Sequence, residues 1–140
     1  MNAQLLARLL GIVFFLAGVA GVVPWSSSPA PFDANVITLD QYYRFIFGML
    51  PVNLVHDGLH ALLGVWGLLA GSNFRASVGY LRFVAVFYLF IVILGIIPIT
   101  NTLFGAVPIY GWDVLLHLVA VLIAAYGGFG AGSIQQTEPE

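Results

Sequence analysis

Two pairs of ionisable side chains in this sequence have the spacing of one helical turn. His56 and His60 are four residues apart, and so are Asp113 and His117. Residues i and i+4 share one face of a helix, so each pair would point its two side chains the same way. Imidazole nitrogens and a carboxylate are ligands of Zn²⁺ and other divalent transition metals. The spacing therefore predicts a metal site made of His56, His60, Asp113 and His117, provided that the two helices meet.

Other roles fit the same residues. His60 and His117 can hold a haem iron from opposite sides, or the cluster can relay protons. Covalent haem attachment is excluded because the chain has no cysteine. Imidazoles and carboxylates can also hydrogen-bond across helices and lock a bundle together. Such a structural polar cluster would include Asn53, just before the histidine pair, and Asp57 beside it.

No catalytic motif accompanies these residues. The chain has no cysteine nucleophile, and a Gly-x-Ser-x-Gly elbow, a P-loop and a GxGxxG loop are all absent from the sequence. We therefore expect no enzyme and assign no catalytic residue. Its four basic side chains are scattered arginines, so no basic patch supports binding to nucleic acid.

The segments that carry these residues are apolar enough for a membrane. The 140 residues are 61% hydrophobic and 7% charged, whereas soluble domains carry about 25% charged residues. Continuous apolar stretches, rather than alternating ones, favour helices over a barrel, and each is near the ~20 residues that a spanning helix needs. The stretches run roughly over residues 5–23, 51–70, 83–99 and 112–130. The prediction is an all-α, integral membrane four-helix bundle, a single domain over residues 1–140 surrounded by the lipid bilayer.

The sequence also repeats itself. Residues 8–24 and 82–98 both begin with Arg and end in Gly-x-x-Pro. Residues 51–71 align with residues 108–128, which pairs His56 with Asp113, His60 with His117 and Gly71 with Gly128. This pattern predicts two tandem helical hairpins of the same orientation, over residues of about 5–71 and 79–130.

Charge and composition orient the remaining segments. Arg8 lies near the start of the first stretch, and Arg75 and Arg82 lie in the connection 71–82. With Arg44 as an exception on the other side, the positive-inside rule places both termini and this connection in the cytoplasm. The first stretch is expected to be retained, because its pattern recurs in the third stretch, which cannot be a signal peptide. Residues 24–50 are rich in aromatic side chains near the membrane interface, which fits either a surface helix or an ordered apolar loop. Residues 133–140 form a polar tail.

Three motifs resemble a family of short bacterial membrane proteins known as domain of unknown function 4383. They are Asn-x-x-His at residues 53–56, Leu-Gly-x-x-Pro at residues 94–98 and Asp-x-x-x-His at residues 113–117. The resemblance covers residues of about 5–130. It implies a four-span bundle without an established activity, and it singles out the positions Asn53, His56 or His60, Asp113 and His117.

The leading hypothesis for function is a non-enzymatic, structural or accessory component of a membrane assembly, located in the inner or an internal membrane of a bacterium. Its partners would be other membrane subunits or a second copy of the chain. One alternative is an intramembrane metal- or haem-binding module that uses the histidine and aspartate pairs. Another is an oligomer that conducts protons or small solutes, because four short spans leave little room for a pore in one chain.

Overall fold

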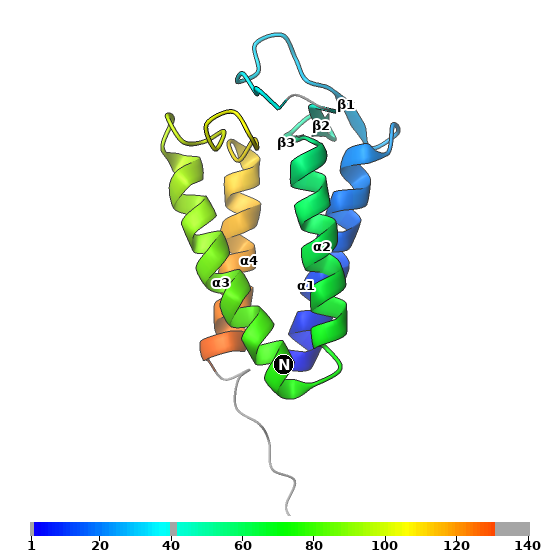
Figure 1. Cartoon of the computed structure of the whole chain (residues 1–140), viewed down its shortest axis with the longest axis vertical. Helices are drawn as coiled ribbons and strands as arrows, with labels where there is room; N and C mark the ends of the chain where they lie inside the picture. The colour runs from blue at the N-terminus through cyan, green and yellow to red at the C-terminus, as the bar shows by residue number, and fades with distance from the viewer. Residues whose placement is uncertain (1, 40–41, 131–140) are drawn as a thin grey trace, which may run out of the picture.

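The computed structural model describes residues 2–39 and 42–130, and this part of the chain holds four helices and one small sheet (Figure 1). The helices are α1 (Ala3–Val22), α2 (Leu54–Ala70), α3 (Phe74–Ile96) and α4 (Trp112–Phe129). Helix α1 packs mainly along α2, and α3 mainly along α4. The two pairs stand side by side and lean apart toward the end that carries the sheet (Figure 1). A mostly helical fold is confirmed, whereas the description as all-α is wrong because of the sheet.

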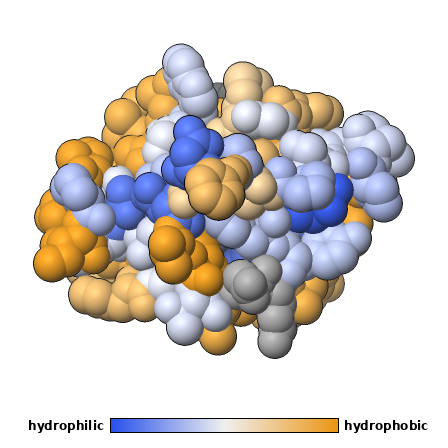
Figure 2. All heavy atoms as spheres, turned by 90° about the horizontal axis from the view of Figure 1, so that it is seen from above, coloured by the Kyte–Doolittle hydropathy of each residue, from blue (hydrophilic) through white to orange (hydrophobic). Residues whose placement is uncertain are grey.

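By length and composition, helices α1, α3 and α4 are each able to cross a membrane, and α2, with 17 residues, is a shorter apolar helix. Large apolar side chains cover the outside of the helices; Leu16 and Leu122 are 59% and 63% exposed. Seen from the end with the sheet, hydrophilic residues gather at the centre and apolar residues surround them (Figure 2). An apolar belt around hydrogen-bonded helices is the arrangement that a lipid environment requires.

The segment between α1 and α2 forms a small sheet, where either a surface helix or an ordered apolar loop was predicted within residues 24–50. Among its described residues none is helical. Phe47 and Gly48 have φ values of 49° and 70°, a left-handed conformation that interrupts a helix and here reverses the chain. The strands pair antiparallel in the order β1-β2-β3, and they are β1 (Ser27–Pro29), β2 (Arg44–Ile46) and β3 (Leu50–Val52).

The two loops at this end of the bundle are joined to each other. The hydroxyl groups of Tyr43 and Tyr110 form a hydrogen bond between the segment before α2 and the segment before α4. Burial, together with this hydrogen bond, raises the pKa of Tyr43 above its ordinary value. The Tyr43 hydroxyl therefore keeps its proton to a higher pH than an ordinary tyrosine does.

The third helix begins earlier than the apolar stretch suggested. Helix α3 starts at Phe74 rather than near residue 79 or 83, because the Asn73 side chain accepts a hydrogen bond from the Ala76 N–H (3.1 Å) and caps it. The connection between α2 and α3 is therefore residues 71–73, and not 71–82. The predicted polar tail, 133–140, lies outside the described residues.

Two arginine side chains donate hydrogen bonds to the C-termini of helices, on the side of the bundle opposite the sheet. Arg8 Nε, on α1, donates to the Gly71 carbonyl after α2 (3.0 Å). Arg82 Nε, on α3, donates to the Gly128 carbonyl near the end of α4 (2.7 Å). Each cation thus satisfies a carbonyl that the last turn of a helix leaves free, at the negative end of the helix dipole.

Helices α1 and α2 approach each other closely at glycines. A Cβ atom added to Gly64 would lie 2.5 Å from the backbone nitrogen of Phe15, and one added to Gly11 would lie 2.7 Å from that of Leu68. Small residues at such positions let membrane helices pack backbone against backbone. The α1–α2 interface therefore depends on the absence of side chains at Gly11 and Gly64.

Replacing Gly64 by alanine is expected to lower the free energy of unfolding by about 1–3 kcal/mol, the usual effect of overpacking. The matched control is Gly58→Ala on the same helix, where an added Cβ meets nothing within 4 Å. The control should be neutral or more stable by up to about 1 kcal/mol, because alanine favours a helix over glycine. Unfolding curves in a denaturing detergent would compare the two. Equal stabilities would refute the close approach of α1 and α2.

Candidate metal centre

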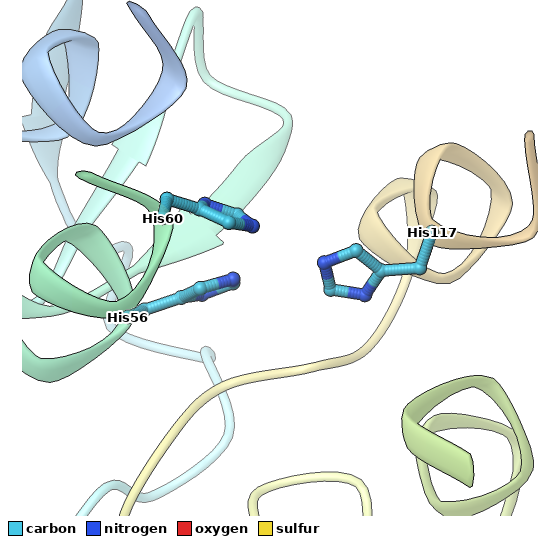
Figure 3. Close-up of side chains that lie close together, drawn as sticks. All are labelled: His56, His60 and His117. Atoms are coloured by element: carbon cyan, nitrogen blue, oxygen red, sulfur yellow. The ribbon is translucent and has the colours of Figure 1, made fainter. Parts of the chain in front are cut away.

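The three histidines meet inside the bundle. His56 and His60, from the first two turns of α2, point toward His117, from the second turn of α4 (Figure 3). Each offers one ring nitrogen, and these three nitrogens all lie within 4.8 Å of one another. Zn²⁺ holds imidazole nitrogens at about 2.0–2.1 Å, which in a tetrahedron places them about 3.3 Å apart. Small rotations of the rings would therefore bring all three nitrogens onto one ion.

All three rings are removed from the surface. His56, His60 and His117 are 3%, 8% and 5% exposed. The chain contains three histidines in total, so every histidine belongs to this cluster. Buried, neutral imidazoles are the form that binds a metal ion, since the lone pair must be free.

Asp113, predicted as a ligand, lies beside the cluster rather than in it. Its Oδ2 is 3.3 Å from His117 Nδ1, and both residues are buried. The two atoms are close enough for an ion pair but are not aligned as a hydrogen bond. Asp113 is not one of the three residues whose ligand atoms converge. This is the position of a carboxylate that orients a metal-binding histidine and raises its basicity.

Asn53 holds the start of α2 in place. Its side chain is fully buried and its Oδ1 accepts a hydrogen bond from the His56 N–H (3.0 Å), which caps the helix. Its Nδ2 donates to the carbonyls of Leu39 (2.9 Å) and Ala106 (2.8 Å). Asn53 thus ties the turn that carries His56 to both long loops.

Asp57 lies apart from the histidines. It packs against α1, where a Cβ atom added to Gly21 would clash with its carboxylate. Asp57 is buried, and neither of its carboxylate oxygens has a hydrogen-bond partner among the described residues. Asp57 and Asn53 are joined by the backbone bond from the Asp57 N–H to the Asn53 carbonyl (2.9 Å), and their grouping in one structural polar cluster stays a prediction.

Two aromatic residues that the sequence analysis did not identify pack against the histidine rings. Phe14 stacks on His60, with ring centroids 5.6 Å apart, and Tyr88 meets His117 edge-on at 4.7 Å. Phe14 and Tyr88 also stack on each other at 5.1 Å. In a sequence these residues are indistinguishable from ordinary apolar packing within a span, and only the fold reveals their role.

Several buried polar atoms of the cluster have no hydrogen-bond partner. Among the described residues, His56 Nδ1 has no hydrogen-bond partner. Both ring nitrogens of His117 and Oδ2 of Asp113 are likewise without a hydrogen bond in this part of the chain. An unpaired buried polar group costs about 1–3 kcal/mol, so a cluster that served only to join helices should pair these atoms. A bound metal ion would use the free nitrogen lone pairs.

The space beside the rings suits an ion better than a haem. A cavity of about 60 Å³ adjoins all three histidines, toward α3 and the loop before α4. The His60 and His117 rings are 5.7 Å apart and edge-on, and the His56 ring lies 4.5 Å from His60. His56 thus occupies the place that a macrocycle ligated by His60 and His117 would need. The arrangement therefore favours a metal ion over the predicted haem.

A comparison with known families identifies most of the chain. A family model described as Domain of unknown function (DUF4383) matches residues 4–130, which include all four helices and the whole histidine cluster. No curated protein and no solved structure matches the chain.

Proposed function

The chain belongs to the family described as domain of unknown function 4383, and we propose that it is a non-enzymatic integral membrane protein whose histidine cluster binds one divalent transition-metal ion. The convergence of three ring nitrogens within 4.8 Å, contributed by two helices, carries this proposal. His56, His60 and His117 are the ligands. Asp113 orients His117 and offsets part of the charge of the ion.

The donor set narrows the choice of metal. Imidazole suits zinc, copper, nickel and iron, whereas Mg²⁺ and Ca²⁺ prefer oxygen ligands. The absence of cysteine removes thiolate ligands from consideration. Three protein ligands also leave one position of a tetrahedral ion open. We therefore propose zinc or copper, held with a fourth ligand that the chain does not supply.

A purely structural role for the polar residues is the second candidate, and it was the leading hypothesis from the sequence. The three hydrogen bonds of Asn53 favour it, because they join α2 to both loops. The unpaired nitrogens of His56 and His117 argue against it. Conduction by an oligomer has no specific support, since the histidines face one another within a single chain.

We further propose that the two halves are tandem hairpins. The end of the bundle that holds Arg8 and Arg82 would lie in the cytoplasm of a bacterial cell. The bonds from Arg8 to Gly71 and from Arg82 to Gly128 support the repeat. The sequence alignment pairs Arg8 with Arg82 and Gly71 with Gly128, so the same bond occurs at equivalent positions of the two halves. The positive-inside rule supports the orientation and would place both termini in the cytoplasm. Within the inner membrane the protein would be an accessory subunit of an assembly or would pair with a second copy.

Metal analysis of the full chain tests the proposed function. The protein would be purified in mild detergent, without chelator and without a histidine tag, and then analysed for bound metals before and after titration with Zn²⁺. We expect one ion per chain. Because all three histidines belong to the cluster, nitrogen NMR of labelled histidine should show three imidazoles shifting together. If the protein binds no stoichiometric ion after titration, the proposed metal binding is wrong and the structural role of the polar residues remains.

A further inference from the structure

A long apolar groove runs along the seam between α1 and α4 and ends at the histidine cluster. Its part nearer the sheet has a volume of about 300 Å³ and reaches His60, Asp113 and His117. Its other part, of about 390 Å³, extends to Tyr126 near the opposite end of α4. Both parts share Leu10, Val13 and Ile123, so they form one continuous groove. It is present because α1 contacts α4 much less than it contacts α2.

The groove has the length of one lipid chain. Asp113 and Tyr126 are 13 positions apart on α4, which corresponds to about 20 Å at 1.5 Å per residue. A chain in one leaflet spans about 15 Å, half of the ~30 Å hydrocarbon core. The groove also opens toward lipid, since Val13 in its wall is 58% exposed. One extended acyl chain therefore fits along it.

Imidazole and carboxylate groups line one end of the groove only, and at the other end Tyr126 is the one polar side chain among the described residues that line it. Apart from the histidines and Asp113, the residues that line the part nearer the sheet are apolar. A molecule that fills the groove would therefore have a hydrocarbon chain and a single polar end group. That end group would lie beside His60 and His117.

Charge decides what this end group is. A divalent ion held by three neutral imidazoles carries two positive charges in a buried place. An unbalanced charge in an apolar interior is costly, so the open fourth position favours a negatively charged ligand. A carboxylate supplies this charge and an oxygen ligand for zinc.

We infer that the groove binds a long-chain monocarboxylic acid taken from the bilayer. Its carboxylate occupies the fourth position on the metal ion, and its chain lies between α1 and α4. This inference rests on the metal site proposed above and assigns its external ligand.

The test uses the cobalt-loaded full-length protein in detergent, because the visible spectrum of Co²⁺ responds to its ligands. Palmitate should change the spectrum saturably, at one equivalent per chain. Hexadecanol, which has the chain without the carboxylate, and acetate, which has the carboxylate without the chain, should leave it unchanged at the same concentration. A spectrum that palmitate does not alter, or that acetate alters equally, would overturn the inference.

Variants that fill the groove add a structural control. Val13→Trp places a large ring in the groove and should keep one Co²⁺ per chain while weakening the palmitate response at least about tenfold. The matched control is Val86→Trp on α3, because Val86 does not line the groove and is similarly exposed, at 63% against 58%. Ile123→Trp replaces Val13→Trp if the latter does not fold. If the wild-type protein does not bind Co²⁺, the metal site itself is rejected. If palmitate changes the spectrum of the Val13→Trp protein as strongly as that of the wild type, only the lipid ligand is rejected.

Discussion

Replacing His117 by leucine is expected to raise the dissociation constant for Zn²⁺ by at least about 100-fold, because it removes one of three direct ligands, and loss of a mere supporting contact already costs about 10–100-fold. Leucine is apolar and of similar size. It also removes two buried nitrogens that lack hydrogen-bond partners. Replacing such a group by an apolar one of similar shape is close to neutral, so the metal-free variant should be as stable as the metal-free parent.

The matched control for this prediction is Asp113→Asn. Its carboxylate touches His117 Nδ1 but is not among the converging ligands. The variant should keep one ion per chain and lose about 10–100-fold in affinity, the effect of removing a supporting carboxylate. Isothermal titration gives both affinities. Unfolding with and without Zn²⁺ gives the stabilisation by the ion, about 2.7 kcal/mol at a concentration 100 times the dissociation constant. A metal-free His117→Leu protein that is strongly destabilised would instead show that the histidine holds the helices together.

Asn53→Ala is expected to have the largest effect on stability, a loss of about 3–5 kcal/mol. The substitution removes the fully buried Asn53 side chain and leaves the part-buried Leu39 and Ala106 carbonyls and the buried His56 N–H without their partner. Each unpaired buried group costs about 1–3 kcal/mol. The start of α2 should also become less well fixed, and with it the His56 ring.

Asn73→Ala is the control, because Asn73 caps α3 with the same type of hydrogen bond but is exposed and supports no loop. Loss of a cap alone costs about 1 kcal/mol. Detergent-denaturant unfolding of both variants separates the cap from the loop contacts. If the two losses were equal, the bonds from Asn53 to the loops would contribute nothing.

The helices and the convergence of the histidines could be predicted from the sequence, for simple physical reasons. Long apolar runs can satisfy their backbone in lipid only as helices. The spacing of four residues places His56 and His60 on one face of such a helix. The alignment of residues 51–71 with 108–128 brought His117 to the equivalent place on another helix.

The sheet could not be predicted from the sequence, because its strands are three residues each and pair across a separation of up to about twenty positions. Strands this short carry no readable alternation, and the turn that closes β2 onto β3 contains Phe47, a residue that rarely adopts a positive φ. The places of Asp57 and Asp113 were equally hidden, since whether a carboxylate faces α1 or the histidines depends on helix rotation and side-chain conformation.

The division of the histidines between α2 and α4 has a consequence for biosynthesis. A ribosome delivers His56 and His60 first, and 56 more residues must follow before His117 emerges. Two imidazoles from α2 alone would bind the proposed ion far more weakly than three, so a nascent or truncated chain that lacks α4 would not retain it. Ion occupancy would then mark molecules whose last described helix has been inserted and docked, and quality-control proteases could distinguish them from unfinished chains by the stability that the ion adds.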